Sequence, residues 1–447
     1  MEAPAAGPRS GAKGVLFLFR LRDFRRLWVG MSVSLLGDGI FLVALAWQAY
    51  DLSNAPSALA VIGVAMTGAQ LAFLLAGGIV SDRFDRRAVM IGADAVRGIA
   101  VATLGLLSLT GELHLWHMLF IGAAYGGGTA FFGPAFDAII PDLVPRDLLP
   151  QANSLDQFVR PAAWGLAGPA VGGWIIFAWS AGGAFVVDAL TFAVSIAALL
   201  RIRYRRETGA KLGMGLAEAL GDAREGFQYV RSKVWLWGTF LAATIAYLMF
   251  WGPVEVLLPY IVRNDMHGHA RDLGFILAVG GMGAITGALV MAGRGQPRRH
   301  ITFIFVVWTL STIAVAAYGL AHYAWQAMIA AFAFNVLEAA GTIVWATTKQ
   351  RLVPNRLLGR VSSFDWFISI GLLPLSFALV GPAAAAFGAR TTLVVAGILG
   401  GIATLGFLFL PGMRETEQWQ PQPEPVQYPE AVEPRPLAAQ TTSRSAG

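Results

Sequence analysis

The chain has 447 residues, of which 56% are hydrophobic and 13% are charged. A soluble domain carries about 25% charged residues, so these proportions exclude an ordinary soluble globular protein. Cysteine is absent, which excludes a disulfide framework, a thiolate metal site and a cysteine nucleophile. The net charge is +6, but the basic residues are spread over separate connectors, so no nucleic-acid partner is expected.

The hydropathy pattern predicts an all-α integral membrane protein, because apolar runs of about 20 residues or more recur along the chain. An even number of such runs is present, so both termini are expected on the same side of the membrane. The twelve predicted spans are 27–50, 57–80, 88–110, 115–140, 152–178, 182–200, 234–262, 272–292, 301–320, 325–348, 360–382 and 390–410.

Polar segments divide these spans into two six-helix halves, 27–200 and 234–410. In residues 1–26 an apolar stretch precedes the arginines, which is the reverse of a signal peptide and predicts a cytoplasmic leader with an interfacial helix. Residues 201–233 have apolar side chains at helical spacing and are predicted to be a cytoplasmic linker containing an amphipathic helix. The proline-rich tail, 411–447, is predicted to be disordered.

Lysine and arginine are concentrated in alternate connectors. The connectors on the other side contain only Arg263, Arg271 and Arg390. Cytoplasmic connectors of membrane proteins are enriched in Lys and Arg, so both termini are predicted to lie in the cytoplasm. The excess of Arg over Lys, with abundant Ala and Gly, is typical of a GC-rich bacterium. The expected location is therefore a bacterial cytoplasmic membrane.

The sequence also repeats itself. Residues 143–156 align without gaps to residues 352–365, and half of the aligned positions are identical. Each copy joins the fourth span to the fifth span of its half. The two halves are therefore predicted to be parallel pseudo-repeats related by an axis along the membrane normal.

The turn after span 2 is rich in charges that are costly so close to a bilayer. Its pattern, Gly-x-x-x-Asp-Arg-x-x-Arg-Arg, resembles the loop between helices 2 and 3 of the major facilitator superfamily of secondary transporters. The resemblance implies the major facilitator fold and a gating role. The alternative is a positive-inside anchor with two incidental acids. The residues that carry the pattern are Gly78, Asp82, Arg83, Arg86 and Arg87.

The gating hypothesis is that Asp82 and Arg83 lock the cytoplasmic side against the start of span 11, near Asp365. The positive end of that helix dipole would favour a carboxylate.

A second resemblance lies on span 5, where a proline that can kink the helix is surrounded by glycines that permit close packing. It is similar to the glycine-proline motif of major facilitator antiporters, and simple packing is the alternative. The arginine motif usual on span 4 of drug/proton antiporters is missing. The matching residues are Gly168, Pro169, Gly172 and Gly173.

Ionisable residues inside spans are functional candidates by default. Asp38 and Glu338 lie near the middle of spans 1 and 10, and Glu255 lies in the outer half of span 7. The family resemblance implies that spans 1, 4, 7 and 10 line the central cavity. Desolvation disfavours a charged carboxylate, so such an acid could exchange a proton against a cationic substrate.

Structural ion pairs are the alternative for these acids, for example Asp137 with Arg160 or Asp94 with Arg97. For Asp188, Asp137 and Arg160 the structural interpretation is favoured. Aromatic residues are expected to supply an apolar cavity surface for the substrate. These are Trp47, Tyr125, Tyr247, Phe250, Trp251 and Trp345.

The chain resembles the branch that contains macrolide-efflux proteins and the enterobactin exporter. This implies a proton-coupled exporter, or antiporter, of a hydrophobic or amphipathic small molecule such as a drug, antibiotic or siderophore. The alternatives are an importer of a nutrient or lipid, a transport-incompetent sensor or scaffold, and a polytopic membrane enzyme. The expected partners are the substrate, protons and the lipid bilayer, and the chain is expected to act as a monomer.

No cofactor is expected, because no glycine-rich phosphate loop is followed by Lys-Ser/Thr. No metal site is expected either. The paired histidines, His114 with His117 and His267 with His269, are interpreted as solvated loop residues.

Overall fold

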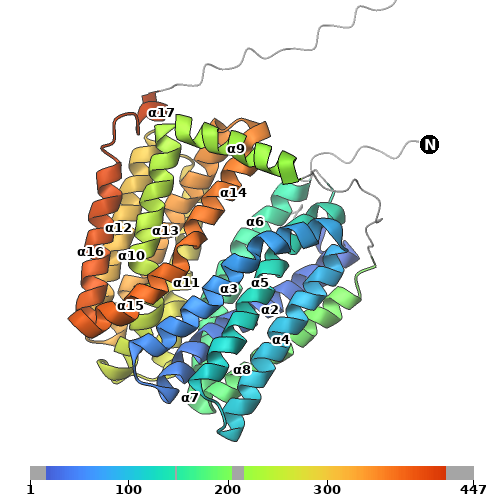
Figure 1. Ribbon diagram of the computed structural model, residues 1–447, viewed down its shortest axis with the longest axis vertical. Helices are drawn as coiled ribbons and strands as arrows, with labels where there is room; N and C mark the ends of the chain where they lie inside the picture. The colour runs from blue at the N-terminus through green and yellow to red at the C-terminus, as the bar shows by residue number, and fades with distance from the viewer. Residues whose placement is uncertain (1–16, 146–147, 204–215, 419–447) are drawn as a thin grey trace, which may run out of the picture.

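The computed structural model describes residues 17–145, 148–203 and 216–418, and these are helical apart from short turns. Two bundles of long helices lie side by side (Figure 1). A bilayer cannot satisfy backbone N–H and C=O groups, so each apolar segment forms a helix that satisfies them internally. This confirms the predicted all-α membrane architecture.

The first bundle contains six helical segments, of which the fifth is built from three consecutive pieces. The segments are α2 (Arg22–Leu52), α3 (Pro56–Arg83), α4 (Arg86–Thr110), α5 (Leu115–Leu143), the series α6 (Leu149–Arg160), η2 (Pro161–Ala167) and α7 (Gly168–Ala178), and α8 (Ala181–Leu200).

The second bundle repeats this order, and its fifth segment is also broken. The segments are α10 (Val234–Asn264), α11 (Ala270–Arg294), α12 (His300–Leu320), α13 (Ala324–Leu352), the pair α14 (Asn355–Gly371) and α15 (Leu373–Phe387), and α16 (Ala389–Phe407).

Eleven segments within the described residues are long and apolar enough to cross a membrane. The remaining predicted span, 115–140, corresponds to α5, a 29-residue helix that contains the polar residue His117 and three consecutive glycines. All twelve predicted spans are therefore present as helices. Their ends differ by several residues: α2, for example, begins at Arg22 and not at residue 27.

The two bundles pack in the same pattern. In the first, α3 lies against α5, and both α2 and α4 pack on α8. In the second, α11 lies against α13, and both α10 and α12 pack on α16. Corresponding helices thus make corresponding contacts, as expected for the parallel pseudo-repeats predicted from the sequence.

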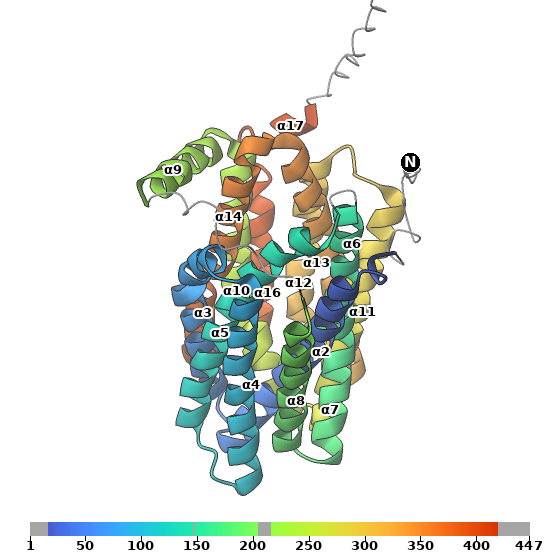
Figure 2. The ribbon, with the colours of Figure 1, turned by 90° about the vertical axis from the view of Figure 1, so that its right-hand side faces the viewer.

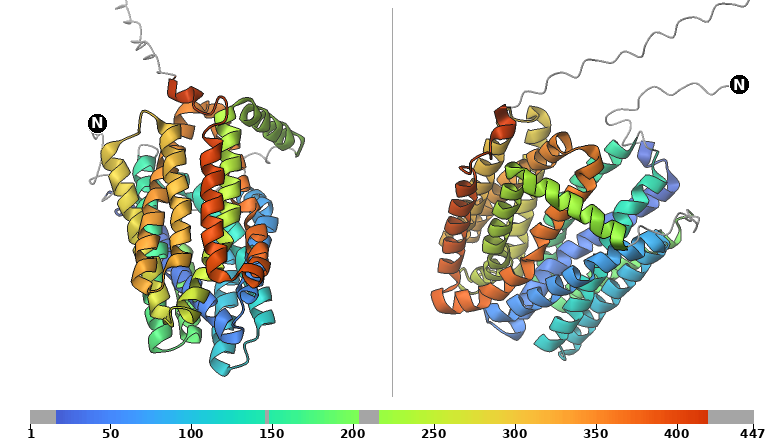
Figure 3. Two further views of the ribbon diagram at one scale, coloured as in Figure 1. Left: turned by 90° about the vertical axis from the view of Figure 1, so that its left-hand side faces the viewer. Right: turned by 45° about the horizontal axis from the view of Figure 1, so that its top comes forward.

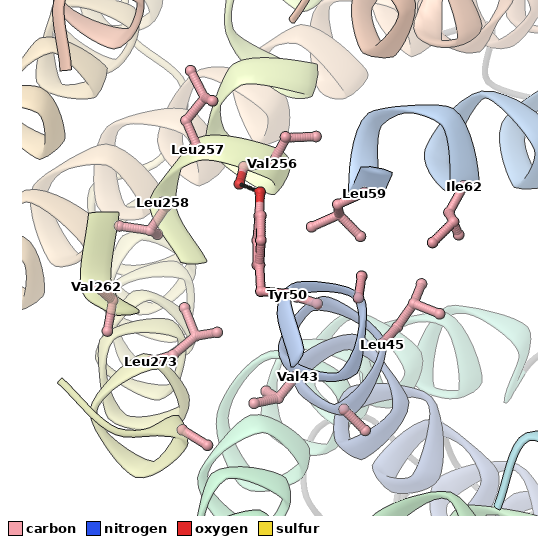
Figure 4. Packing of buried hydrophobic residues seen from close by; sticks show 14 of the residues in the cluster. Val43, Leu45, Tyr50, Leu59, Ile62, Val256, Leu257, Leu258, Val262 and Leu273 are labelled. Carbon is pink, nitrogen blue, oxygen red and sulfur yellow. Dashed lines mark hydrogen bonds between the residues drawn. The ribbon is translucent and has the colours of Figure 1, made fainter. Parts of the chain in front are cut away.

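The bundles meet where α7 packs on α11, α15 packs on α3 and α2 approaches α10. Figure 4 shows part of this seam, with Tyr50 of α2 reaching across to α10. The Tyr50 hydroxyl donates a 2.6 Å hydrogen bond to the carbonyl oxygen of Val256. We call the end of the molecule that carries the α2–α3 connection the distal end. Tyr50 lies near this end.

The opposite end, which we call the linker end, carries α9 (Leu216–Ser232) and the short helix α17 (Glu415–Gln418). Helix α9 lies at this end and projects at one side of the bundles (Figure 2). Its Glu225 carboxylate forms ion pairs with Arg360 and Arg356 of α14, the latter at 3.5 Å. The amphipathic linker helix predicted within 201–233 is thus present, and it is bound to the second bundle.

The prediction of a disordered tail from residue 411 is wrong for its first part. The Met413 side chain is fully buried. In α17, the Glu417 carboxylate accepts hydrogen bonds from the Thr302 backbone N–H at 2.5 Å and from the Thr302 hydroxyl at 2.9 Å. Figure 3 shows α17 resting on the linker end of the second bundle. Residues 419–447, and residues 1–16 of the predicted leader, lie outside the described residues.

Candidate transport site

Asp38 lies in the interior of the first bundle, where it contacts two other helices. The Tyr125 hydroxyl of α5 donates a 2.6 Å hydrogen bond to Asp38 Oδ1. The Arg97 guanidinium of α4 lies 3.6 Å from the same oxygen, and the Asp38 side chain is 16% exposed. The predicted central acid is therefore one member of a charged group.

Arg97 is the centre of this group. Its guanidinium donates to Asp94 Oδ1 of the same helix, and Ser195 of α8 donates to Asp94 Oδ2 at 2.6 Å. The Asp94–Arg97 ion pair considered from sequence is thus present. The guanidinium carbon also lies 4.7 Å from the ring centres of Phe132 and Phe192. The Arg97 cation is therefore buried among aromatic rings. The neighbouring carboxylates compensate for the free energy that its burial costs.

Asp188 of α8 is the third carboxyl group of this cluster, and it is fully buried. Its neighbour on α2 is Gly37, where an added Cβ would come within 2.1 Å of Asp188 Oδ1. The glycine therefore allows α2 and α8 to approach closely beside Asp38. We call Asp38, Asp94, Arg97 and Asp188 the acid–arginine cluster.

Glu338 occupies a different setting in the second bundle. It lines a cavity of about 30 Å³, large enough for water, between α10, α12, α13 and α16. Its Oε1 accepts a 2.8 Å hydrogen bond from Thr342, and no cation pairs with it among the described side chains. The cavity wall is mainly aromatic and aliphatic, with Tyr247, Phe250 and Trp308 among its residues.

Glu255, the third predicted acid, lies at the seam between the bundles. It faces a small pocket lined by Leu42 and Ala46 of α2 and by Leu273 and Leu277 of α11. These neighbours are apolar. The structure therefore separates Glu255 from the acid–arginine cluster and from the Glu338 cavity.

The predicted cavity aromatics lie at several separate places. Tyr247 and Phe250 line the Glu338 cavity, and Trp251 packs against both of them. Tyr125 is buried and stacks on Phe41, with ring centres 4.3 Å apart.

Trp345 and Trp47 lie elsewhere. The expectation that Trp345 offers a cavity surface is wrong for this conformation. Trp345 is 5% exposed and its ring packs against Trp235, while its indole N–H donates a 3.1 Å hydrogen bond to Asp365. Trp47 lies near the distal end, beneath the guanidinium of Arg263 at 5.3 Å.

The predicted gate motif joins α3 to α4 at the linker end. Arg86 donates to Asp142 at 2.5 Å and to the Ala138 carbonyl at 2.7 Å, both on α5. Arg87 donates to the Leu200 carbonyl at 3.0 Å. These bonds tie the turn to other helices of its own bundle.

Other parts of the gate motif behave differently. Gly77 packs tightly on the α5 backbone, but Gly78 faces open space. Arg83 is exposed, and the Asp82 side chain lies outside the described part of the structure. Asp365, the expected partner, accepts instead from Lys349 and from Trp345 of its own bundle. The Asp82 lock therefore stays a prediction.

The glycine-proline motif lies where the bundles cross. Pro161–Ala167 form a π-helical stretch, and Gly168 begins the α-helix that follows. Gly168 and Gly172 pack on the α2 backbone near Gly39 and Ile40. Gly173 packs on α11 of the other bundle, where an added Cβ would lie 2.7 Å from the Ala270 oxygen. This short helix therefore contacts both α2 of its own half and α11 of the other half.

The suggested Asp137–Arg160 ion pair is not formed. Arg160 binds Asp156 on the preceding turn of its own helix, at 2.8 Å. Sequence reasoning also missed the meeting of Asp188 with Asp38 and Arg97. The only available signal was Gly37 beside Asp38, a small residue that marks a close helix contact.

The sequence between residues 15 and 435 matches a family described as transmembrane secretion effector. Macrolide efflux protein A of Streptococcus pyogenes is 22% identical over 380 residues, which cover 84% of this chain and 93% of that protein. The enterobactin exporter EntS of Citrobacter koseri is 25% identical over 411 residues, covering 90% and 94%.

Solved structures with the same fold include a bacterial homologue of the iron transporter ferroportin in an inward-facing state. It has a TM-score of 0.64 and 14% identity, covering 87% of this chain and 98% of that one. A bacterial homologue of the lysosomal transporter Spinster has a TM-score of 0.61 and 15% identity, covering 92% and 100%. The chain belongs to the transmembrane secretion effector family of major facilitator proteins, and it is a membrane transporter and not an enzyme.

Proposed function

We propose that this protein is a proton-coupled exporter of a hydrophobic or amphipathic small molecule, working as a monomer in a bacterial cytoplasmic membrane. One observation carries the proposal: each bundle holds a carboxyl group inside the membrane, in contrasting surroundings. Asp38 belongs to a buried charged cluster suited to a proton. Glu338 faces a cavity lined with aromatic side chains.

The Glu338 cavity is the proposed substrate-recognition region. Its apolar wall suits a drug-like molecule, and its single carboxylate suits an amine or another cationic group on that molecule. The cavity of about 30 Å³ is too small for such a molecule in this conformation. Substrate entry therefore requires the two bundles to move relative to each other. The efflux-named relatives support export as the direction.

The contacts between the bundles support an inward-facing resting state. Arg263 pairs with Asp51 at 2.5 Å, and Asn54 donates to Asn264 at 2.7 Å, both across the distal end. The distribution of Lys and Arg assigns the linker end to the cytoplasm. On this assignment the distal contacts close the outer side of the pathway.

Closing the cytoplasmic side would bring the α3–α4 turn toward α14. Asp365 is held there by Lys349 and Trp345. We propose that these bonds are exchanged when Asp82 and Arg83 approach. Protonation of the first bundle would shift the equilibrium toward the state in which these bonds are exchanged. The glycines of α7, which pack on α2 and on α11, would permit these two helices to move relative to each other.

The test is accumulation of a panel of fluorescent cationic drugs in inside-out vesicles, where an exporter pumps inward. Wild-type accumulation should be abolished by a protonophore and by Asp38→Asn. Asp137→Asn, which removes an exposed acid outside the cluster, is the matched control and should leave accumulation unchanged. Robust accumulation by Asp38→Asn would refute the coupling role of Asp38. Drug movement only into right-side-out vesicles would indicate an importer.

A further inference from the structure

We infer that Asp188, not Asp38, is the residue that holds the exchanged proton, with Arg97 and the other two acids of the cluster as its electrostatic setting. The inference rests on the proposed function, because it assigns the proton site of that transport cycle. Sequence reasoning favoured a structural role for Asp188. The contacts of the side chain lead to the opposite conclusion.

The first observation is the incomplete hydrogen bonding of Asp188. Its Oδ1 accepts a 3.1 Å hydrogen bond from Thr191, on the next turn of α8. Its Oδ2 is buried and has no hydrogen-bond partner among the described residues. An ionised carboxylate with a buried, unsatisfied oxygen is strongly disfavoured, whereas a neutral carboxyl group avoids most of that penalty.

The second observation is the charge balance of the cluster. Three carboxyl groups share one guanidinium, and Arg97 stays protonated under all ordinary conditions. Arg97 contacts Asp94 directly and lies 3.6 Å from Asp38, whereas no ion pair joins it to Asp188 within the described structure. Asp188 is therefore the carboxyl group whose charge is least compensated.

Among the residues that the structure describes, no other cation compensates the charge of Asp188. The ionisable groups that face it are Asp38 from α2, Asp94 and Arg97 from α4, and Tyr125 from α5. Helix α7, the remaining neighbour of α8, carries no ionisable residue. Adding one proton to Asp188 leaves two carboxylates, Asp38 and Asp94, and one guanidinium. Both of these carboxylates have Arg97 as a partner.

The route that we propose for the proton follows from which carboxyl group of the cluster is exposed. Asp38 is the partly exposed member of the cluster, and its neighbour Gly37 packs directly on Asp188. A proton taken up at Asp38 would pass to the Asp188 carboxyl group, which leaves Asp38 ionised beside Arg97. Release would follow the reverse path when the bundles reorient. The transfer needs only a proton and no further reactant.

The direct test is infrared difference spectroscopy of the purified full-length protein between acidic and alkaline buffer, without any substrate. Wild type should show a buried carboxylic-acid carbonyl band in acid that disappears in alkali. Asp188→Asn should remove the band. Asp38→Asn should retain it, and so should the control Asp137→Asn. Loss of the band in Asp38→Asn, with retention in Asp188→Asn, would overturn the assignment.

A second variant guards against misfolding of Asp188→Asn. Thr191→Val keeps the side-chain volume but removes the one hydrogen bond that the described residues donate to the Asp188 carboxylate, so the band should persist to higher pH than in wild type. An unchanged pH dependence would contradict the inference. In vesicles, Asp188→Asn should lose gradient-driven accumulation but retain substrate exchange. Absence of all transport in wild type would refute the proposed function while leaving the infrared result interpretable.

Discussion

The two bundles share one fold but not one interior. Asp38 and Phe250 are each the seventeenth residue of a 31-residue helix. Tyr125 and Phe334 are each the eleventh residue of a 29-residue helix. The Asp38–Tyr125 hydrogen bond of the first bundle thus corresponds to an edge-on Phe250–Phe334 contact in the second, with ring centres 5.3 Å apart.

The same replacement occurs at the proposed proton site. Asp188 is the eighth residue of α8, and the eighth residue of α16 is Ala396. The repeated backbone therefore fixes where side chains meet. In our proposal, the residues at those positions determine whether the interior binds a proton or an apolar molecule. This difference matches the proposed division of roles, in which the first bundle handles the proton and the second contacts the substrate.

The largest expected effect is in the charged interior. Arg97→Gln leaves Asp38 and Asp94 buried without their cation, and removing one partner of a buried ion pair costs about 3–5 kcal/mol. Thermal unfolding in detergent should show a marked loss of stability. Arg160→Gln, which removes a partly exposed ion pair within one helix, is the control. Equal stability of the two variants would mean that the buried cluster contributes no more to stability than a partly exposed ion pair.

Tyr125→Phe should have the next largest effect, because it removes the hydroxyl that donates to Asp38. Hydrogen bonds to charged groups contribute about 1.5–3 kcal/mol. The variant should unfold at lower temperature. Tyr247→Phe, in the second bundle, should be close to wild type, since no hydrogen bond of its hydroxyl is present in the described structure. A larger loss for Tyr247→Phe would reverse the assignment of polar and apolar interiors.

Glu338→Gln tests the other side of the comparison. Removing the charge should weaken binding of a cationic fluorescent drug about tenfold, or about 1.4 kcal/mol. Binding of a neutral drug of similar size should change little. Tryptophan quenching by each drug measures both affinities. Equal weakening for the two drugs would indicate a general disturbance of the cavity and no charge recognition.

The smallest effect is expected at the seam between the bundles. Asp51→Asn breaks the pair with Arg263, which is partly exposed and contributes at most about 1 kcal/mol. Because the chain contains no cysteine, Ala270→Cys gives a single reporter beside Gly173 at this seam. Its labelling rate should rise roughly twofold in the Asp51→Asn background. An unchanged rate would mean that this pair does not hold the distal end closed.

Most of the fold was predictable because lipid imposes simple rules on length, hydropathy and charge placement. The site was less accessible. Asp38 and Glu338 stood out as central charges, but the meeting of Asp188 with Asp38 depends on how α8 rotates against α2 and α4, which no local pattern specifies. Trp345 was misplaced for the same reason: an aromatic residue in a span can face a cavity or the core. The ordered start of the tail depends on a contact with distant Thr302.

That last contact has a consequence for how the protein is made. The N-cap residue of α12, Arg299, provides no side-chain cap. The backbone N–H of Thr302 instead donates to the Glu417 carboxylate, 115 residues later in the chain. A ribosome must therefore complete all of the second bundle, which ends with α16 at Phe407, before this helix end is satisfied. Glu417 then caps the start of α12. A nascent chain released before this residue is made would leave the first turn of α12 frayed.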